Sequence, residues 1–363
     1  MSPSTDGQTV PMSSPRMVEV WRGPLVESAH AGVAAVANAQ GEIIAGWGDT
    51  ALVTYPRSAL KPVQAIALVE SGAYRDDGLT PRHLAIACAS HRGEPVHSTL
   101  VTEWLDVLGL DQEALVCGED RPADEAAAAA ALIAGRPRQR IFHNCSGKHC
   151  GFLAVAQHEG WSLHDYDRLQ HPAQQRYLDA LSELTGADAS ALPFGVDGCA
   201  LPAAALPVAT MAVLMARFAD ARVASPRRRA AIVAIQEAMR AHPHLLSGTD
   251  QPAVMLVRAT RGRIIMKTGA EGFLCAFVPR QGLGLALKIT DGEARARVPA
   301  LLALLSALGL LDASEAQALA ALAEPPVLNS TGAVVGRIRA NAMAFSAPPG
   351  RHDDSARGAA HER

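Results

Sequence analysis

The sequence is poor in aromatic residues and in charge. Phe, Trp and Tyr make up 4% of its 363 residues, Asp, Glu, Lys and Arg make up 19%, and the hydrophobic fraction is 49%. This balance excludes a disordered chain and predicts a core built mainly from aliphatic side chains. The net charge of -3 provides no basic surface for nucleic acid, so we expect no nucleic-acid partner.

Long apolar runs and export features are also missing. No segment has the roughly 18 uninterrupted apolar residues of a membrane helix, so we expect no membrane partner. The first sixteen residues are polar and lack the basic start and apolar stretch of a secretory signal. Six cysteines in a chain of this length do not indicate a disulfide scaffold. We therefore expect reduced thiols and a cytoplasmic location.

The chain is too long to fold around one ordinary core, so its length predicts two lobes. Short β-rich runs occur near both ends of the chain, at residues 31–37, 43–47, 263–267, 273–278, 283–289 and 334–339 (the last as an edge strand). Helical patterns fill the middle, most clearly at 126–134, 174–184 and 206–219, and return at 296–308 and 314–323. This order predicts one sheet made from both ends of the chain beside a helical lobe.

These patterns define the expected domains. We expect flexible tails at 1–16 and 347–363, an α/β lobe made from 17–95 with 250–346, and a mainly helical lobe at 96–249. The fold class is therefore α/β (α+β), with a mixed antiparallel sheet and flanking helices.

The run Tyr55–Pro62, YPRSALKP, places Ser58 three residues before Lys61. Residues three apart share a helix face, and a desolvated lysine can deprotonate a serine. Because Pro62 disrupts a helix interior, we expect a helix from Ser58 to Gly72 with Ser58 in its first turn. The alternative is that Ser58 only caps the helix and the lysine is a surface residue.

Two further runs complete a pattern around this pair. Lys267-Thr268-Gly269 ends a β run, and Cys88–His97 holds Ser90, which we expect to pair with Lys267 and relay protons. The order of these motifs resembles that of serine β-lactamases and penicillin-binding proteins. We expect charged substrate groups to be bound by Arg57, His91 or Glu94. The alternative for the Cys88–His97 run is an ordinary polar turn.

A third group of residues combines thiols with histidines. His143–Cys150 is followed by Asp197–Pro202, which contains Cys199. Thiolates and imidazoles suit zinc, but the spacing is not that of a zinc finger. Because buried cysteines without a metal are common, the residues alone favour that simpler interpretation.

Five runs in order, YPRSALKPVQ, CASHRGEPVH, FHNCSGKHCGFL, VDGCALP and KTGAEG, resemble the bacterial asparaginase II family of the rhizobial type over residues 17–340. The resemblance implies a serine β-lactamase-like fold, a homodimer, and hydrolysis of L-asparagine to L-aspartate and ammonia. It also implies two Ser–Lys pairs and a zinc ion, with Asp197 and His149 supporting the metal or binding the substrate's amino-acid head. The pairs are Ser58 with Lys61 and Ser90 with Lys267, and the zinc ligands are Cys145, Lys148 and Cys199.

The expected reaction is amide hydrolysis through an acyl-enzyme, with Ser58 as nucleophile and Lys61 as its base. Two other functions fit parts of the pattern. A β-lactam or D-peptide hydrolase would use the same serine and lysines, although such enzymes act outside the cytoplasm. A non-catalytic zinc-binding protein would keep the thiols but has no need of two Ser–Lys pairs.

Overall fold

The structure is a computed structural model that describes residues 14–346. Most of the two expected tails lies outside the described residues. Arg16, which we assigned to the N-terminal tail, is instead the first residue of a strand. Within the described range, no helix is both long and apolar enough to cross a membrane.

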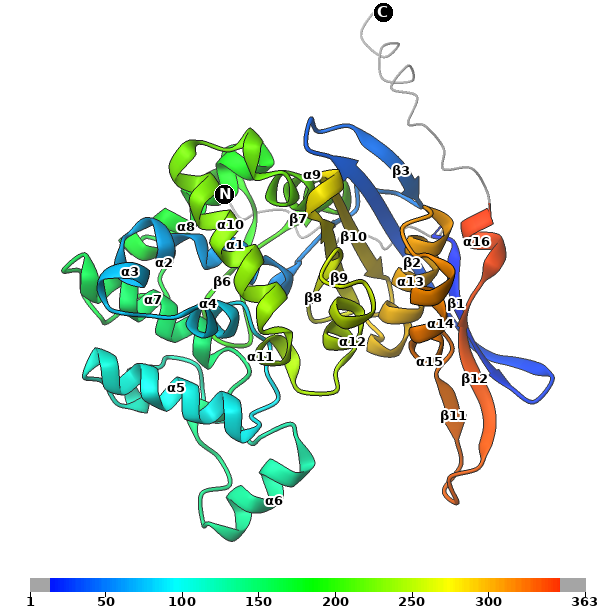
Figure 1. Cartoon of the computed structure of the whole chain (residues 1–363), viewed down its shortest axis with the longest axis horizontal. Helices are drawn as coiled ribbons and strands as arrows, with labels where there is room; N and C mark the ends of the chain where they lie inside the picture. Colours follow the sequence, from blue (N-terminus) through cyan, green and yellow to red (C-terminus); the bar gives the residue numbers. More distant parts are fainter. Residues whose placement is uncertain (1–13, 347–363) are drawn as a thin grey trace, which may run out of the picture.

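One antiparallel sheet is assembled from strands near both ends of the chain (Figure 1). Its strand order is β11-β12-β1-β2-β10-β9-β8, and β3 pairs with β2 beside this path. The strands are β1 (Arg16–Arg22), β2 (Leu25–Asn38), β3 (Ile43–Trp47), β8 (Ile265–Thr268), β9 (Phe273–Val278), β10 (Leu283–Ile289), β11 (Pro326–Leu328) and β12 (Val334–Ala340). The expected β2–β3 hairpin and the β8, β9 and β10 strands are confirmed.

The strand expected at the sheet edge is not the edge. β12 lies between β1 and β11, so the short β11 covers its outer side. Sequence patterning missed β11 because its three residues are largely exposed and show no apolar alternation. Two short pairs complete the β-structure, namely β4 (Val53–Thr54) with β7 (Leu206–Pro207), and β5 (Phe194–Val196) with β6 (Pro202–Ala204).

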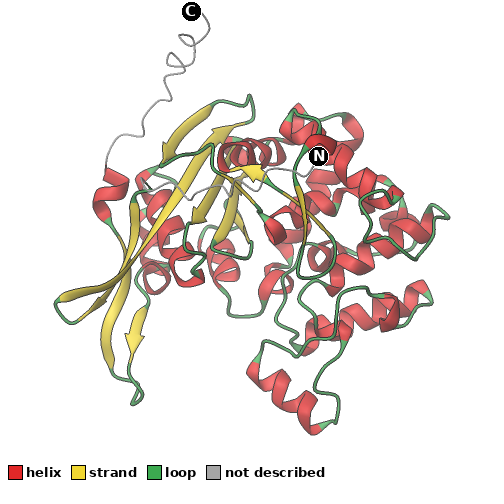
Figure 2. Ribbon diagram, turned by 180° about the vertical axis from the view of Figure 1, so that it is seen from behind, coloured by secondary structure: helices red, strands yellow, loops and turns green. Residues whose placement is uncertain are grey.

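Helices cover the sheet and form a cluster beside it (Figure 2). They are α1 (Lys61–Gln64), α2 (Ile66–Glu70), α3 (Ala73–Asp76), α4 (Pro81–Ala87), α5 (Pro95–Leu108), α6 (Glu125–Ile133), α7 (Ser146–His158), α8 (Pro172–Thr185), α9 (Val208–Ala219), α10 (Pro226–Ala241), α11 (Pro243–Ser247), α12 (Pro252–Ala259), α13 (Arg297–Ala307), α14 (Ala313–Ala318), α15 (Ala320–Ala323) and α16 (Ala342–Ser346). The mixed α/β class predicted from the sequence is confirmed.

The helix expected from Ser58 to Gly72 is broken into three parts. A 3-10 turn, η1 (Arg57–Leu60), is followed by α1 and α2, which meet at Ala65. Pro62 in the first turn of α1 has no N–H to continue the ladder from η1. The chain still turns helically between the two motif residues, because the Lys61 N–H donates to the Ser58 carbonyl.

Both faces of the sheet are buried. On β9, Phe273, Cys275 and Phe277 face one apolar cluster, while the alternate residues face another. The first cluster holds α9 and continues into the helical cluster, and the second packs against α13. We placed α9 in the helical lobe, but it packs directly on β2, β9 and β10. Gly284 permits this contact, since a Cβ there would overlap the α9 backbone.

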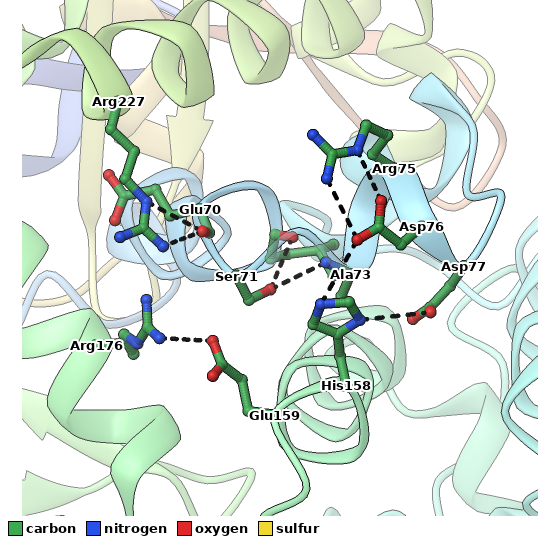
Figure 3. A network of polar contacts seen from close by, with 11 residues as sticks. Glu70, Ser71, Ala73, Arg75, Asp76, Asp77, His158, Glu159, Arg176 and Arg227 are labelled. Atoms are coloured by element: carbon green, nitrogen blue, oxygen red, sulfur yellow. Dashed lines mark hydrogen bonds and ion pairs between the residues drawn. The ribbon is translucent and has the colours of Figure 1, made fainter.

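Ion pairs and hydrogen bonds join several helices of the helical cluster (Figure 3). Arg227 donates to the Glu70 carbonyl, and His158 lies 3.8 and 3.7 Å from the carboxylates of Asp76 and Asp77. Beside them, the Arg228 guanidinium donates to both carboxylate oxygens of Glu70, at 2.9 and 3.1 Å. Both of these side chains are over nine-tenths buried, so this pair fixes α10 on α2.

We expect Arg228→Ala to lower the free energy of unfolding by about 3 kcal/mol, because it leaves the Glu70 carboxylate buried without its partner. Urea denaturation measures the change. Arg227→Ala is the matched control, because Arg227 is exposed, and we expect it to cost less than about 1 kcal/mol. Equal effects of the two variants would contradict the importance given to the buried pair.

Candidate active site

Ser90 lies between two lysines. The Nζ atoms of Lys61 and Lys267 are 3.1 and 2.8 Å from Ser90 Oγ. Lys61 comes from α1 and Lys267 from β8, while Ser90 follows α4 in the loop before α5. One hydroxyl can therefore pass a proton from one amine to the other.

Both amines are buried and are held by the backbone. Lys61 is 0% and Lys267 3% exposed. Lys61 Nζ also donates to the carbonyls of Ala89 and, at 3.3 Å, Asn144, while Lys267 Nζ donates to the Thr268 carbonyl at 2.8 Å. Burial, followed by the proximity of Lys61, holds the pKa of Lys267 well below its usual range. Lys267 is thus suited to accept a proton near neutral pH.

Ser58 lies next to this relay but is not bonded to it. Its side chain lines a pocket of about 400 Å³ that Ser90 also lines. Within residues 14–346, no side-chain hydrogen bond involves Ser58 Oγ. The preceding residue, Arg57, has a left-handed backbone with φ 50°, which is uncommon for a residue with a side chain and concentrates at functional sites. The expected Ser58–Lys61 contact is therefore a shared helical turn rather than a hydrogen bond.

Arg57 and Asp197 form the polar wall of this pocket. Arg57 Nε donates to Asp197 Oδ1 at 2.7 Å, and the Gly198 N–H donates to the same oxygen. Burial opposes the charged form of Asp197, but nearby Lys148 and the bond from Arg57 outweigh it and lower the pKa of the carboxyl. The wall offers a fixed cation and a fixed anion, which suit the carboxylate and the ammonium group of a free amino acid.

The lysine–threonine–glycine run places β8 against η1. Gly269 is buried, and a Cβ at this position would overlap the Pro56 carbonyl oxygen. A glycine is therefore required for Lys267 and Ser58 to share one pocket.

We expect Gly269→Ala to push β8 away from η1 and to lower catalytic activity by about 100-fold, as displacements near 1 Å do. Steady-state kinetics on the purified variant measures the loss. Gly118→Ala is the control, because a Cβ there meets no atom within 4 Å. Full activity of the Gly269 variant would show that the close approach is not needed.

The cysteine cluster adjoins the same pocket. Cys145 and Cys199 line it, and Lys148 Nζ donates to Cys199 Sγ at 3.0 Å. A hydrogen bond from Cys199, together with nearby Lys61 and Lys148, holds the pKa of the Cys145 thiol well below its usual range. The same bond raises the pKa of Cys199. The two neighbouring thiols thus have pKa values shifted in opposite directions, and Cys145 Sγ also lies 3.0 Å from Asn144 Oδ1.

The two thiols are ligands that zinc prefers, whereas a lysine amine is an unusual zinc ligand. Two sulfurs and an amine converge in a buried place, although residues 14–346 hold no group of three His, Cys, Asp or Glu side chains arranged for a metal. Without Lys148, the cluster offers a metal only two donor atoms, the two sulfurs. Burial favours its neutral amine, but Cys145, Cys199 and Asp197 outweigh burial and raise the pKa of Lys148. A metal bound here would have to displace that proton.

Three other residues of the sequence hypotheses lie elsewhere or are already bonded. Glu94 accepts from the N–H and hydroxyl of Thr249 and does not line the pocket that Ser58 and Ser90 share, so it is not placed to bind substrate there. The ring nitrogens of His91 are taken by the Gly93 N–H and the Ser146 hydroxyl. His149 faces the Tyr166 hydroxyl at 2.8 Å and does not line the pockets.

Sequence reasoning missed two residues and one signal. Asn144 accepts from Lys61 and lines the pocket, and Arg297 lines it too and donates to the Gly269 carbonyl. Asn144 lies inside the His143–Cys150 run but was not singled out there, and Arg297 belongs to none of the motifs. The signal is the scarcity of lysine, because the chain has four, at positions 61, 148, 267 and 288, and three of them lie in this site.

Comparisons with known proteins identify the family of this chain. The model of the L-asparaginase II family matches residues 18–340. A search of curated proteins found no match. Among solved structures, the crystal structure of a β-lactamase from Mycobacterium bovis is similar, at 18% identity over 84% of this chain and 97% of that chain, with a TM-score of 0.40. Because the family model spans most of its length, the chain belongs to the L-asparaginase II family.

Proposed function

We propose that this protein is an L-asparaginase that hydrolyses the side-chain amide of L-asparagine to L-aspartate and ammonia. The observation that carries the proposal is Ser90, bonded to two buried lysines beside the unbonded hydroxyl of Ser58. Family membership supports amide hydrolysis, and the Arg57–Asp197 wall supports a substrate with an amino-acid head.

In the proposed mechanism Ser58 Oγ attacks the amide carbon while Lys61 accepts its proton. Ser90 connects Lys61 to Lys267, so the proton moves along the relay to the leaving nitrogen, which departs as ammonia. A water then hydrolyses the β-aspartyl ester and frees Ser58. We assign the attack to Ser58 because Ser90 is already held by both amines.

Ammonia release tests the proposal. We expect the purified protein to release ammonia from L-asparagine with a kcat/KM at least about 100-fold above that for L-glutamine, since one extra methylene misplaces the amide. Nitrocefin, a chromogenic β-lactam, should not be hydrolysed. Rapid nitrocefin hydrolysis without ammonia release from asparagine would replace this proposal with β-lactam hydrolysis.

We also propose that Cys145, Lys148 and Cys199 hold a zinc ion. Bound zinc would supply a Lewis-acidic position at the pocket wall that can accept a carboxylate oxygen. Purified protein should contain roughly one zinc ion per chain, and the Cys145→Ser/Cys199→Ser double variant roughly none. Elemental analysis measures both. Cys117→Ala, which removes a buried thiol outside the pocket, should keep its zinc. Unchanged zinc in the double variant would refute this ligand set.

The homodimer and the cytoplasmic location stay predictions from the resemblance and the sequence. Light scattering after size-exclusion chromatography tests the dimer, and a mass of a single chain at micromolar concentration would contradict it.

A further inference from the structure

A second cavity of about 540 Å³ also has Ser90 in its lining. The two cavities meet there, because five residues line both, namely Ser90, Asn144, Thr268, Ala294 and Arg297. The first cavity already contains the serine and the polar wall that asparagine needs. The second has the size of a ligand site and no role in the mechanism above.

The lining of this second cavity combines arginines with an apolar wall. Four arginines line it, at positions 92, 121, 295 and 297, against the single carboxylate of Asp120. That carboxylate already accepts from the Arg121 N–H at 2.8 Å. The apolar wall is made of Met266, Val298, Pro299, Leu322, Pro325 and Ile338. This chemistry suits an anion that also carries an apolar group.

One of the arginines is held in place by a buried histidine. His30, 4% exposed, has its Nδ1 2.6 Å from Asp291 Oδ2, and Arg295 Nε donates to its Nε2 at 3.1 Å. The Asp291 contact fixes the proton on Nδ1, so Nε2 is free to accept from Arg295. Arg121, by contrast, has no side-chain partner within residues 14–346 and is free to bind a ligand.

The proposed mechanism sets the direction in which a substrate would enter this cavity. Ser58 attacks from the first cavity, and the relay through Ser90 returns a proton to the leaving nitrogen, so that nitrogen lies toward Ser90. In asparagine the nitrogen carries only hydrogens. Any substituent on it would extend past Ser90 and Thr268 into the second cavity.

We propose that the second cavity binds the leaving amino acid of β-aspartyl dipeptides, and that the enzyme hydrolyses these isopeptide bonds as well as asparagine. This inference rests on the proposed function. The ester forms between Ser58 Oγ and the β-carbonyl, the C–N bond breaks, and the amino acid leaves with the proton delivered through Ser90. Water then releases aspartate. The arginines bind the carboxylate of the leaving residue, and the apolar wall binds its side chain.

The test compares four substrates with the purified full chain, namely L-asparagine, β-aspartyl-leucine, β-aspartyl-leucine amide and α-aspartyl-leucine. Leucine release and ammonia release are measured separately. We expect β-aspartyl-leucine to be hydrolysed with a KM about tenfold below that of its amide, which lacks the carboxylate. The α-linked dipeptide should be inert.

Arginine variants then test the assigned contacts. Arg121→Ala and Arg295→Ala should each raise the KM for β-aspartyl-leucine about tenfold and change the KM for asparagine less than twofold. The difference between the two substrates separates a lost contact from a general fold defect. Arg280→Ala, an exposed arginine outside both cavities, is the control.

The outcomes distinguish the two proposals. Asparagine hydrolysis without cleavage of the β-linked dipeptide overturns the second-cavity inference and leaves the proposed function standing. Dipeptide cleavage with no asparagine hydrolysis keeps the inference and overturns the proposed substrate. If both arginine variants cleave the dipeptide with the wild-type KM, the assignment of the cavity is overturned. If neither substrate is hydrolysed, both proposals are overturned.

Discussion

Ser58→Ala should lower kcat for asparagine hydrolysis by at least about 10⁴-fold, as expected when a nucleophile is removed from an intact site. The side chain of Ser58 forms no hydrogen bond with the described part of the chain, so its removal leaves no partner unsatisfied. The variant should therefore fold normally and bind asparagine. Steady-state ammonia release measures kcat, and thermal unfolding checks the fold.

Ser90→Ala provides the sharpest comparison. It removes the bridge between Lys61 and Lys267 but not the proposed nucleophile, so we expect a smaller loss of about 10²–10³-fold. Ser98→Ala, on the exposed face of α5, is the control and should have wild-type kinetics. A Ser58→Ala variant that keeps more than a tenth of wild-type activity would transfer the nucleophilic role to Ser90.

Lys267→Met should lower kcat by about 10³-fold and at the same time stabilise the protein. The amine is buried, and its lowered pKa reports the cost of burying the charged form. Methionine has a similar length and no charge to desolvate, so we expect a gain of about 1 kcal/mol in the free energy of unfolding at neutral pH. Chemical denaturation and ammonia release measure the two effects on one sample.

The direction in which the pKa of Lys267 is shifted determines how stability and activity depend on pH. Between the lowered pKa of Lys267 and its unfolded value of about 10.4, the unfolded chain binds one more proton than the folded chain, so wild-type stability rises with pH relative to the variant. The activity should fall as pH drops through the lowered pKa, because protonated Lys267 accepts no proton. Lys288→Met, a half-buried lysine outside both cavities, is the control. An activity loss shared by both variants would contradict the specific role.

The sequence motifs located the residues of the site and predicted the Ser90–Lys267 pair, which the structure confirms, but they did not predict the partner of Lys61. Spacing linked Ser58 to Lys61, whereas in the structure Lys61 Nζ is hydrogen-bonded to Ser90. Three-residue spacing specifies a shared helix face, but the direction of a long side chain depends on the carbonyls that it reaches, here those of Ala89 and Asn144. These belong to segments distant in sequence, so no local pattern predicts them.

The strands and helices with strong patterns were predictable, and the irregular ones were not. The nearly continuous apolar runs at β2, β9 and β10 carried their own signal, because both faces of each strand meet apolar neighbours. The break of the Ser58 helix into η1, α1 and α2 was not predicted, although Pro62, whose missing N–H interrupts the ladder, was already noted in the sequence. Glu94 was misplaced because a charged residue beside a motif can equally bond a distant backbone, as it does at Thr249.

The distribution of lysine is the clearest signal that sequence reasoning left unused. Arginine remains protonated in proteins, whereas lysine loses its proton when buried. Arginine supplies almost all the positive charge of this chain, which has only four lysines. Three of the four, Lys61, Lys148 and Lys267, are each at most 3% exposed, and burial holds the pKa of Lys267 well below its usual range.

The most direct test of the account is to locate the acyl group during turnover. Wild-type protein is mixed with L-asparagine, quenched in acid within milliseconds, and digested for peptide mass mapping. The account predicts a β-aspartyl ester on the peptide that contains Ser58, with none on the peptide that contains Ser90. An ester on Ser90, or steady ammonia release with no ester on either serine, would contradict it.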